Sequence, residues 1–412
     1  MTLAIKGVAV VAPFGNDEHI GQMLAQEAHC FSDLPFPPYG EPYRFAKSGI
    51  CNWAQEQIVA ASNSKLQKQV DRSTLFAMYC LDRLVNRDVQ SAGAEELQDV
   101  NLTDYGVFIS SQFGGMDFSE IEMAKSLMFG PRRVSTYQAI SWFYAATQGQ
   151  WTIAHKSKSF AKTFTGDGGG FVQSLTAARA ALRLKRCRSA LCGAADACIS
   201  PFALRMVGAA MQADSAPLSV YSLQAKGSGY LPGEGAGFVH VDLPENSDDD
   251  PAVLARISHW GSIATAWHAD ANANANANTN TNTNTNTDRG FFDTITALET
   301  NIGGFSEIDL VLLDGMNVGE YAEFEMALLS TMREKNPPII FCCPKLQFGR
   351  CFSAAMPIDV GIAVKLLHGT PFADSKQLFR NQGRATDGAS IRTILILGQS
   401  VYDYLNYLVL TK

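Results

Sequence analysis

The sequence lacks the patterns that mark several classes of protein. It has nine cysteines, an odd number, and none of them form a C-x-x-C pair. No histidine forms a ligand pair with a nearby cysteine, so we expect neither a metal site nor a disulfide framework. No apolar run approaches the ~20 residues of a membrane-spanning helix. Residues 1–13 have neither the basic region nor the cleavage site of a signal peptide. We therefore expect a protein of the reducing cytoplasm.

An excess of positive charge is also missing. Lysine and arginine number 33 against 40 aspartates and glutamates, which gives a net charge of -7. This balance argues against nucleic acid or an anionic membrane as the main partner. The chain has 412 residues, of which 46% are hydrophobic. It can bury a large core and exceeds one ordinary domain.

Strand-like and helix-like segments alternate along the chain. Short apolar runs predict buried strands, and apolar residues at helical spacing predict helices between them. The predicted strands are 8–12, 106–109 and 189–192, and the predicted helices are 72–84 and 174–184. The pattern indicates the α/β class.

The second part of the chain repeats this order. Residues 253–257 begin a new strand, 308–313 match the strand at 106–109, and the helix at 357–367 matches the one at 174–184. We predict two duplicated α/β halves, residues 1–243 and 252–412, joined through the acidic stretch Asp242–Asp250.

One segment has low complexity. Residues 269–288 alternate Ala-Asn and then Thr-Asn. Such polar sequence buries too little apolar surface to fold, so it predicts a disordered surface loop within the second half. An ordered asparagine ladder is the alternative.

A glycine-rich motif points to a family. Tyr230–Val241 reads YLPGEGAGFVHV. No helix follows it, which excludes a dinucleotide-binding loop and favours a turn into a buried strand. The motif resembles the P-x-G-E-G-A-G signature of β-ketoacyl synthases. Asp71–Thr74 and Lys162–Asp196 also resemble that family. The resemblance implies a thiolase fold, with two duplicated α/β halves in an αβαβα arrangement.

The family condenses acyl chains with a nucleophilic cysteine at a strand-to-helix elbow, two histidines and a lysine. At the corresponding positions this sequence has Asp167 (or Gly168) for the cysteine, and Asp314 and Arg350 for the histidines. Lys345 matches the lysine. The resemblance therefore implies a chain without catalytic residues of its own.

The residues at the two histidine positions resemble those of one subfamily. Asp-Gly and Gly-Arg at the two histidine positions are found in chain-length factors, the β subunits of ketosynthase heterodimers in bacterial type II polyketide synthases. Asp314 and Arg350 could form an ion pair across the former active site. At the elbow, however, most chain-length factors carry glutamine. An ionised Asp167 would repel a malonyl carboxylate, so we do not expect it to decarboxylate malonyl units by itself.

Residues 110–144 are similar to the chain-length-factor helix that lies at the heterodimer interface and lines the polyketide tunnel. By position, the residues that close the tunnel are Met116, Ser119, Met123 and Ile140. The first three recur at helical spacing and share one face of a helix. The alternative for the two methionines is an ordinary place in the core.

Near the C-terminus the predicted strand 391–397 is followed by Gly398-Gln399-Ser400, where the family has a G-F-G-G turn that shapes the active site. This departure also suits a chain without catalysis.

The resemblance implies a non-catalytic chain-length factor. Its partners would be a catalytic ketosynthase and an acyl carrier protein, and it would limit the length of a poly-β-ketone built from malonyl units, for an aromatic polyketide. It would need no cofactor, since the acyl chain is held on the carrier protein's phosphopantetheine through the partner. Three alternatives are an aryl polyene chain-length factor, a self-sufficient condensing enzyme with displaced catalytic residues, and a scaffold for the carrier protein.

Overall fold

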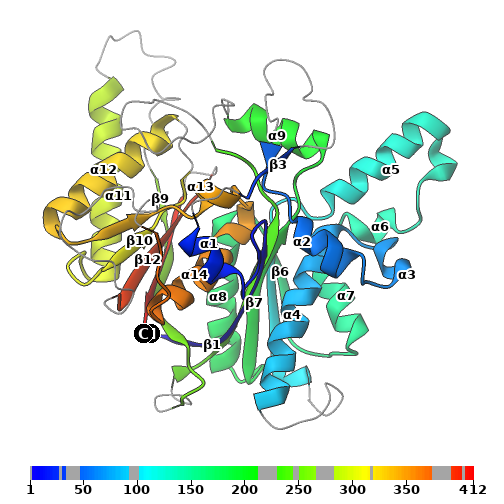
Figure 1. Cartoon of the computed structure of the whole chain (residues 1–412), viewed down its shortest axis with the longest axis horizontal. Coiled ribbons are helices and arrows are strands. Elements are labelled where there is room, and N and C mark those ends of the chain that lie inside the picture. The colour runs from blue at the N-terminus through cyan, green and yellow to red at the C-terminus, as the bar shows by residue number, and fades with distance from the viewer. Residues whose placement is uncertain are drawn as a thin grey trace.

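The computed structural model describes ten segments of the chain (Figure 1). They are residues 2–26, 30–33, 47–91, 102–211, 230–244, 250–265, 283–315, 319–373, 391–400 and 404–412.

Five strands of the N-terminal half form one part of the main sheet, in the spatial order β6-β5-β7-β8-β1. Strand β5 runs parallel to β6 and β7, whereas β8 runs antiparallel to β7 and β1. The strands are β1 (Leu3–Ala12), β5 (Tyr105–Ser111), β6 (Ala161–Thr165), β7 (Ser189–Asp196) and β8 (Gly235–Asp242).

Five strands of the C-terminal half repeat this arrangement. Their order is β11-β10-β12-β13-β9, with the same sequence of parallel and antiparallel pairings. The strands are β9 (Ala255–Ala264), β10 (Leu310–Leu312), β11 (Ile340–Cys342), β12 (Thr393–Ser400) and β13 (Tyr404–Thr411). The two sets join where Leu3–Ile5 of β1 pairs with Ala255–Ile257 of β9. The predicted duplication is confirmed.

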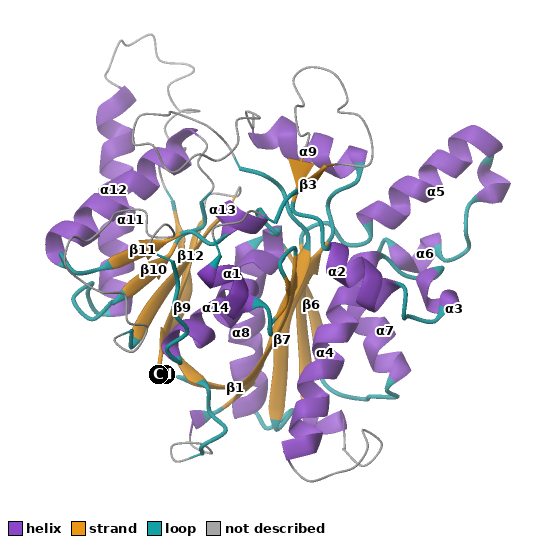
Figure 2. Cartoon of the chain, viewed as in Figure 1, coloured by secondary structure: helices purple, strands orange, loops and turns teal. Residues whose placement is uncertain are grey.

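Helices complete five layers, α-β-α-β-α (Figure 2). Helices α8 (Gly168–Arg183) and α14 (Ala355–Leu367) lie between the two sets of strands and contact both. Helices α4 (Arg72–Ser91) and α7 (Ala146–Ala154) cover the outer side of the N-terminal strands. Helices α11 (Thr283–Ile302) and α12 (Gly319–Lys335) cover the outer side of the C-terminal strands. This is the predicted fold class.

The place of each helix explains its sequence. Helix α14 is buried at every residue except Lys365, because strands pack on both of its sides. Helix α4 has strands on one side only, and it buries Leu75, Leu81 and Leu84 along one face. The glycine motif serves this packing: a Cβ on Gly237 of β8 would lie 2.7 Å from the backbone nitrogen of Ile358 in α14.

Shorter elements connect these layers. Strand β2 pairs with β1, and β3 pairs with β4 in a separate two-stranded sheet. The shorter strands are β2 (Gly15–Asn16), β3 (Ser32–Asp33) and β4 (Lys47–Ser48). The remaining helices are α1 (Ile20–Ala25), α2 (Asn52–Ala54), α3 (Ser64–Gln67), α5 (Met116–Phe129), α6 (Gln138–Ser141), α9 (Pro201–Met211) and α13 (Lys345–Phe348). Four single turns are η1 (Gln55–Val59), η3 (Leu102–Asp104), η4 (Pro131–Arg133) and η7 (Phe352–Ala354).

Three details differ from the sequence-based expectations or extend them. The C-terminal strand does not end at Leu397, because β12 pairs with β13 through Ser400. The predicted loop 269–288 is wrong at its end, where α11 begins at Thr283, and residues 269–282 lie outside the described part of the chain. No helix among the described residues is long and apolar enough to cross a membrane.

Candidate functional site

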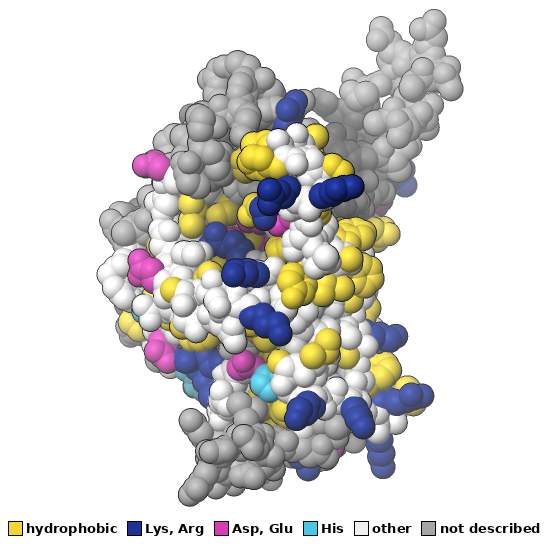
Figure 3. Space-filling model, turned by 90° about the vertical axis from the view of Figure 1, so that its right-hand side faces the viewer, with side chains coloured by type: hydrophobic (Ala, Val, Ile, Leu, Met, Phe, Trp, Pro, Cys, Tyr) yellow, Lys and Arg dark blue, Asp and Glu magenta, His cyan; other side chains and the backbone are white. Residues whose placement is uncertain are grey.

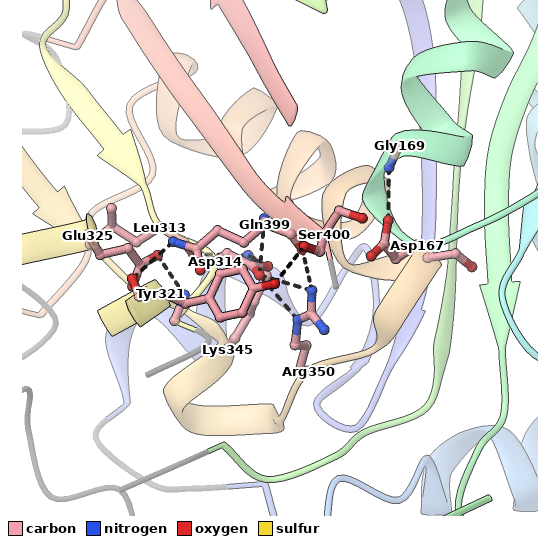
Figure 4. A network of polar contacts seen from close by, with 12 residues as sticks. Asp167, Gly169, Leu313, Asp314, Tyr321, Glu325, Lys345, Arg350, Gln399 and Ser400 are labelled. Atoms are coloured by element: carbon pink, nitrogen blue, oxygen red, sulfur yellow. Dashed lines mark hydrogen bonds and ion pairs between the residues drawn. The ribbon is translucent and has the colours of Figure 1, made fainter. Parts of the chain in front are cut away.

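The candidate site forms where the carboxyl ends of parallel strands from both halves face each other, a usual place for sites in α/β proteins (Figure 4). Asp167 lies at the elbow between β6 and α8. Asp314 follows β10, Lys345 and Arg350 follow β11, and Gln399 lies near the end of β12. All five residues are buried.

The site centres on an ion pair between Arg350 and Asp314. The guanidinium Nη2 lies 3.0 Å from Asp314 Oδ2, and Nε donates to the same oxygen at 3.2 Å. Nη2 also donates to the backbone carbonyl of Gln399 at 2.6 Å, and the backbone amide of Gln399 donates to Asp314 Oδ2 at 3.2 Å. The rings of Tyr230 and Phe352 lie 5.5 and 5.8 Å from the guanidinium carbon. The hypothesised ion pair is present.

Electrostatics keep Arg350 charged. Burial lowers the pKa of its guanidinium, but the neighbouring carboxylates, Asp314 above all, outweigh burial and raise it above its usual value. A guanidinium is a donor only and does not release a proton in proteins. The arrangement therefore holds a fixed positive charge at Arg350.

Lys345 extends the network into the C-terminal half. Its ammonium donates to the carbonyl of Leu313 at 3.0 Å, contacts the carboxylate of Asp359 on α14, and lies 3.9 Å from Asp314 Oδ1. Burial lowers the pKa of Lys345, and the charges of Asp359 and Asp314 raise it further than burial lowers it. Two buried cations thus face two buried carboxylates, which compensates the cost of removing each from water.

Asp167 caps helix α8 and occupies the elbow. Its carboxylate accepts a hydrogen bond from the Gly169 amide at 3.4 Å, and Gly168 is already the first helical residue. A carboxylate at this end compensates the positive pole of the helix dipole. The amide groups at the start of α8, which could otherwise stabilise an anion, face a negative charge of the protein itself.

The structure separates the four predicted tunnel residues into two pairs. Met116 packs against the cluster that contains Phe352, and Ser119 Oγ accepts from Gln138 Nε2 at 3.1 Å, so both belong to the base of α5. Met123 and Ile140 are 60% and 48% exposed. In this chain the four side chains do not form one buried wall.

The base of α5 is held by carboxylates whose role was not predicted. Asp71 accepts from the amide of Phe118 in the first turn of α5 at 3.0 Å, and from the amide of Ser73 at the start of α4 at 2.9 Å. Glu120 accepts from the amide of Phe202 at the start of α9 at 2.9 Å. The Asp-Arg motif at 71–72 was the available signal, but it does not reveal which helix the carboxylate would hold.

The outer part of α5 and the neighbouring α6 expose large apolar side chains, which we call the α5–α6 face (Figure 3). Each is at least 48% exposed: Ile121, Met123, Leu127, Met128, Phe129, Ile140, Trp142 and Phe143. Exposed apolar patches occur at protein–protein, membrane and ligand-binding surfaces. Within the described residues, no three His, Cys, Asp or Glu side chains are grouped to hold a metal ion.

Curated relatives cover most of the chain. It is 27% identical over 372 residues to the tetracenomycin polyketide synthase ketoacyl synthase beta subunit of Streptomyces glaucescens, a match that covers 88% of this chain and 84% of the relative. It is also 27% identical over 316 residues to the actinorhodin polyketide putative beta-ketoacyl synthase 2 of Streptomyces coelicolor, with coverage of 74% and 70%.

Solved structures share the fold over the whole chain. The ishigamide ketosynthase/chain length factor matches with a TM-score of 0.73 at 16% identity, covering 100% of this chain and 99% of that one. A ketosynthase bound to the hexaketide, in complex with its type II polyketide synthase acyl-carrier protein, matches with a TM-score of 0.68 at 17% identity and the same coverage.

A protein-family model also matches the chain. The model described as beta-ketoacyl synthase, N-terminal domain, matches residues 2–243, which is more than half of the chain. These residues contain the elbow at Asp167 and the glycine motif that packs β8 against α14. The chain belongs to the β-ketoacyl synthase family.

Proposed function

We propose that this chain is the non-catalytic, chain-length-determining subunit of a type II polyketide ketosynthase heterodimer. The observation that carries the proposal is the buried Arg350–Asp314 pair, since by the sequence resemblance these residues stand where the family's chemistry needs proton-transferring imidazoles. Asp167 at the start of α8 offers a carboxylate where the family has a thiol nucleophile. The tetracenomycin relative, which is named a beta subunit of a polyketide synthase, supports the same role.

The proposed partner is a catalytic ketosynthase. The α5–α6 face leaves eight large apolar side chains exposed, which is unfavourable for a chain that works alone. Strand β6, next to this face, pairs with β5 on one side only among the described residues, so its other edge is open to a strand of the partner. An acyl carrier protein would bring malonyl units to the partner's active site.

Chain length would be limited at the interface. Met116 is held within this chain, whereas Met123 and Ile140 would be buried by the partner. A tunnel end built from both chains would stop a growing poly-β-ketone by steric overlap, which is costly in a packed site. We propose an aromatic product, no cofactor beyond the carrier protein's phosphopantetheine, and a cytoplasmic location in which the nine cysteines stay reduced.

Reconstitution tests this proposal. The chain is assayed for malonyl-dependent condensation with carrier protein, first alone and then with a ketosynthase that retains its Cys-His-His set. We expect no turnover alone and products of defined length from the pair. Turnover by the chain alone would instead favour a self-sufficient enzyme. A product spectrum unchanged by Met116→Ala and Met123→Ala would favour a scaffold, and polyene products would favour an aryl polyene chain-length factor.

A further inference from the structure

Charge is strongly segregated along this chain. Residues 123–195 contain eleven lysines and arginines but a single acidic residue, Asp167, which is buried. This segment therefore carries a net charge of 11 - 1 = +10. The whole chain carries -7, so the remaining residues carry -17.

Several of these basic residues lie on the same side of the molecule as the α5–α6 face (Figure 3). The segment 123–195 supplies the second half of α5 and all of η4, α6, α7, β6 and α8. Figure 3 shows dark-blue side chains between and below the yellow ones on this side of the molecule, with few magenta ones. Arg132 and Arg133 lie in η4 beyond the tip of α5 and are exposed, as are Lys156 and Lys158 before β6 and Lys162 within it.

The basic residues around β6 form one connected surface. The ring of Phe160 lies 5.8 Å from the ammonium of Lys162 and 6.0 Å from the guanidinium of Arg186. Arg186 precedes β7, and the amino ends of the parallel strands β5, β6 and β7 lie together. The charges that follow α8 thus join those that precede β6.

Few acids neutralise this surface. Asp82 accepts hydrogen bonds from Trp151 and His155, and Asp104 lies 3.7 Å from Arg188. On α5, Glu122 is buried and pairs with Lys125 at 2.5 Å. In the described part of the chain, no ion pair involves Arg132, Arg133, Lys156, Lys158 or Lys162.

We propose that the exposed basic residues on this side of the molecule select an acidic, non-identical partner for the α5–α6 face and exclude a second copy of this chain. A symmetric dimer would bring the same patch of both copies together, so that positive charges oppose positive charges. Like charges across an interface disfavour the wrong partner, whereas an acidic surface of the partner gains attraction and faster association. The inference rests on the proposed heterodimer and names the charge of the partner's facing surface.

The salt dependence of self-association tests the inference on the chain alone. Sedimentation velocity is measured between about 50 and 500 mM NaCl, which shortens the screening length from above ~10 Å to below ~5 Å. We expect weak self-association at low salt that becomes stronger as salt screens the repulsion. The triple variant K156E/K158E/K162E should self-associate about tenfold more tightly than the wild type at low salt, because repulsion turns into attraction.

The matched control changes three exposed basic residues of the C-terminal half, R289E/R392E/K412E. It alters the net charge equally and should leave self-association unchanged. A wild-type homodimer that forms at low salt and does not tighten with salt would overturn the inference, as would equal behaviour of the two triple variants.

A second measurement guards against misfolding of the triple variant. In complex with a catalytic ketosynthase, the wild-type heterodimer should weaken as salt rises, since its charges attract. A heterodimer that is insensitive to salt contradicts the inference even if the condensation assay succeeds. Condensation by the chain alone would defeat the proposed function whatever the salt response.

Discussion

The buried polar site and the α5–α6 face differ in how complete they are. At the strand ends, Arg350, Asp314 and Lys345 compensate one another within this chain, away from solvent. On the α5–α6 face, large apolar side chains and unpaired basic residues are left open. The polar site is complete within the folded chain, whereas the α5–α6 face stays exposed until another surface covers it.

Breaking the buried pair should have the largest effect. Arg350→Ala leaves the Asp314 carboxylate buried without its cation, which costs roughly 3–5 kcal/mol. Urea unfolding of the purified chain would show the loss as a lower midpoint with an unchanged slope. The exposed Arg133→Ala serves as a control and should change stability by less than about 0.5 kcal/mol. An Arg350→Ala chain as stable as the wild type would remove the basis for calling the site complete.

A pH effect should follow from Asp196, which ties the halves together at the edge of the same site. It accepts from Ser111 Oγ at 2.7 Å and from the Ser353 amide at 3.0 Å. Burial outweighs these hydrogen bonds and raises its pKa from 3.8 to about 6. The folded state therefore binds the carboxyl proton of Asp196 more tightly than the unfolded state does. The stability that this proton contributes is full below pH ~4 and is lost as pH rises through ~6, a change of roughly 3 kcal/mol.

The measurement for Asp196 is the unfolding free energy at pH values between about 4 and 7, compared with Asp196→Asn. The variant loses hydrogen bonds and is less stable overall, but its stability should lack this fall with rising pH. Parallel pH profiles of wild type and variant would show that Asp196 is ionised throughout.

Loosening the base of α5 should have an intermediate effect. Asp71→Ala removes the acceptor for the first turns of both α4 and α5, and a lost cap of this kind costs about 1–2 kcal/mol. In the reconstituted pair it should also broaden the range of product lengths, since α5 carries Met116. Ser64→Ala, at an exposed position of the short helix α3, is the control. Reduced stability with an unchanged product range would limit Asp71 to a structural role.

The smallest stability effect distinguishes the two pairs of tunnel residues. Met123→Ala should change the stability of the isolated chain by less than about 0.5 kcal/mol, because its side chain is 60% exposed. Met116→Ala should cost more, since it packs against the Phe352 cluster. Both should lengthen the product of the pair. An equal loss of stability for the two variants would place Met123 in the core of the isolated chain.

The sequence predicted much of the fold because its signals are local. Apolar runs and helical spacing located β5, β7 and α14, and the glycine motif marked a turn into a strand that the structure places against α14. Strand β13 was missed, although Tyr404–Thr411 is apolar. One of its partners, β9, is distant in sequence, and the other, β12, was predicted to end too early, at Leu397.

The site was predictable to the extent that motifs carried it. Asp167, Asp314, Lys345 and Arg350 came from the resemblance, and the contact between Asp314 and Arg350 followed from their opposite charges. The partners Gln399 and Asp359 did not, since a backbone carbonyl leaves no mark in sequence and an aspartate within an apolar helix has many possible roles. The split between Met116 and Met123 was also hidden, because helical spacing defines a face but not what covers it.

The pairing of β1 with both β8 and β9 has a consequence for biosynthesis. Apart from the short strand β2, the strands that pair with β1 are made much later, at residues 235–242 and 255–257. Until then its apolar residues have no sheet to join, and non-local pairing of this kind slows folding. Truncations that end before β8 should therefore fail to form a stable N-terminal half.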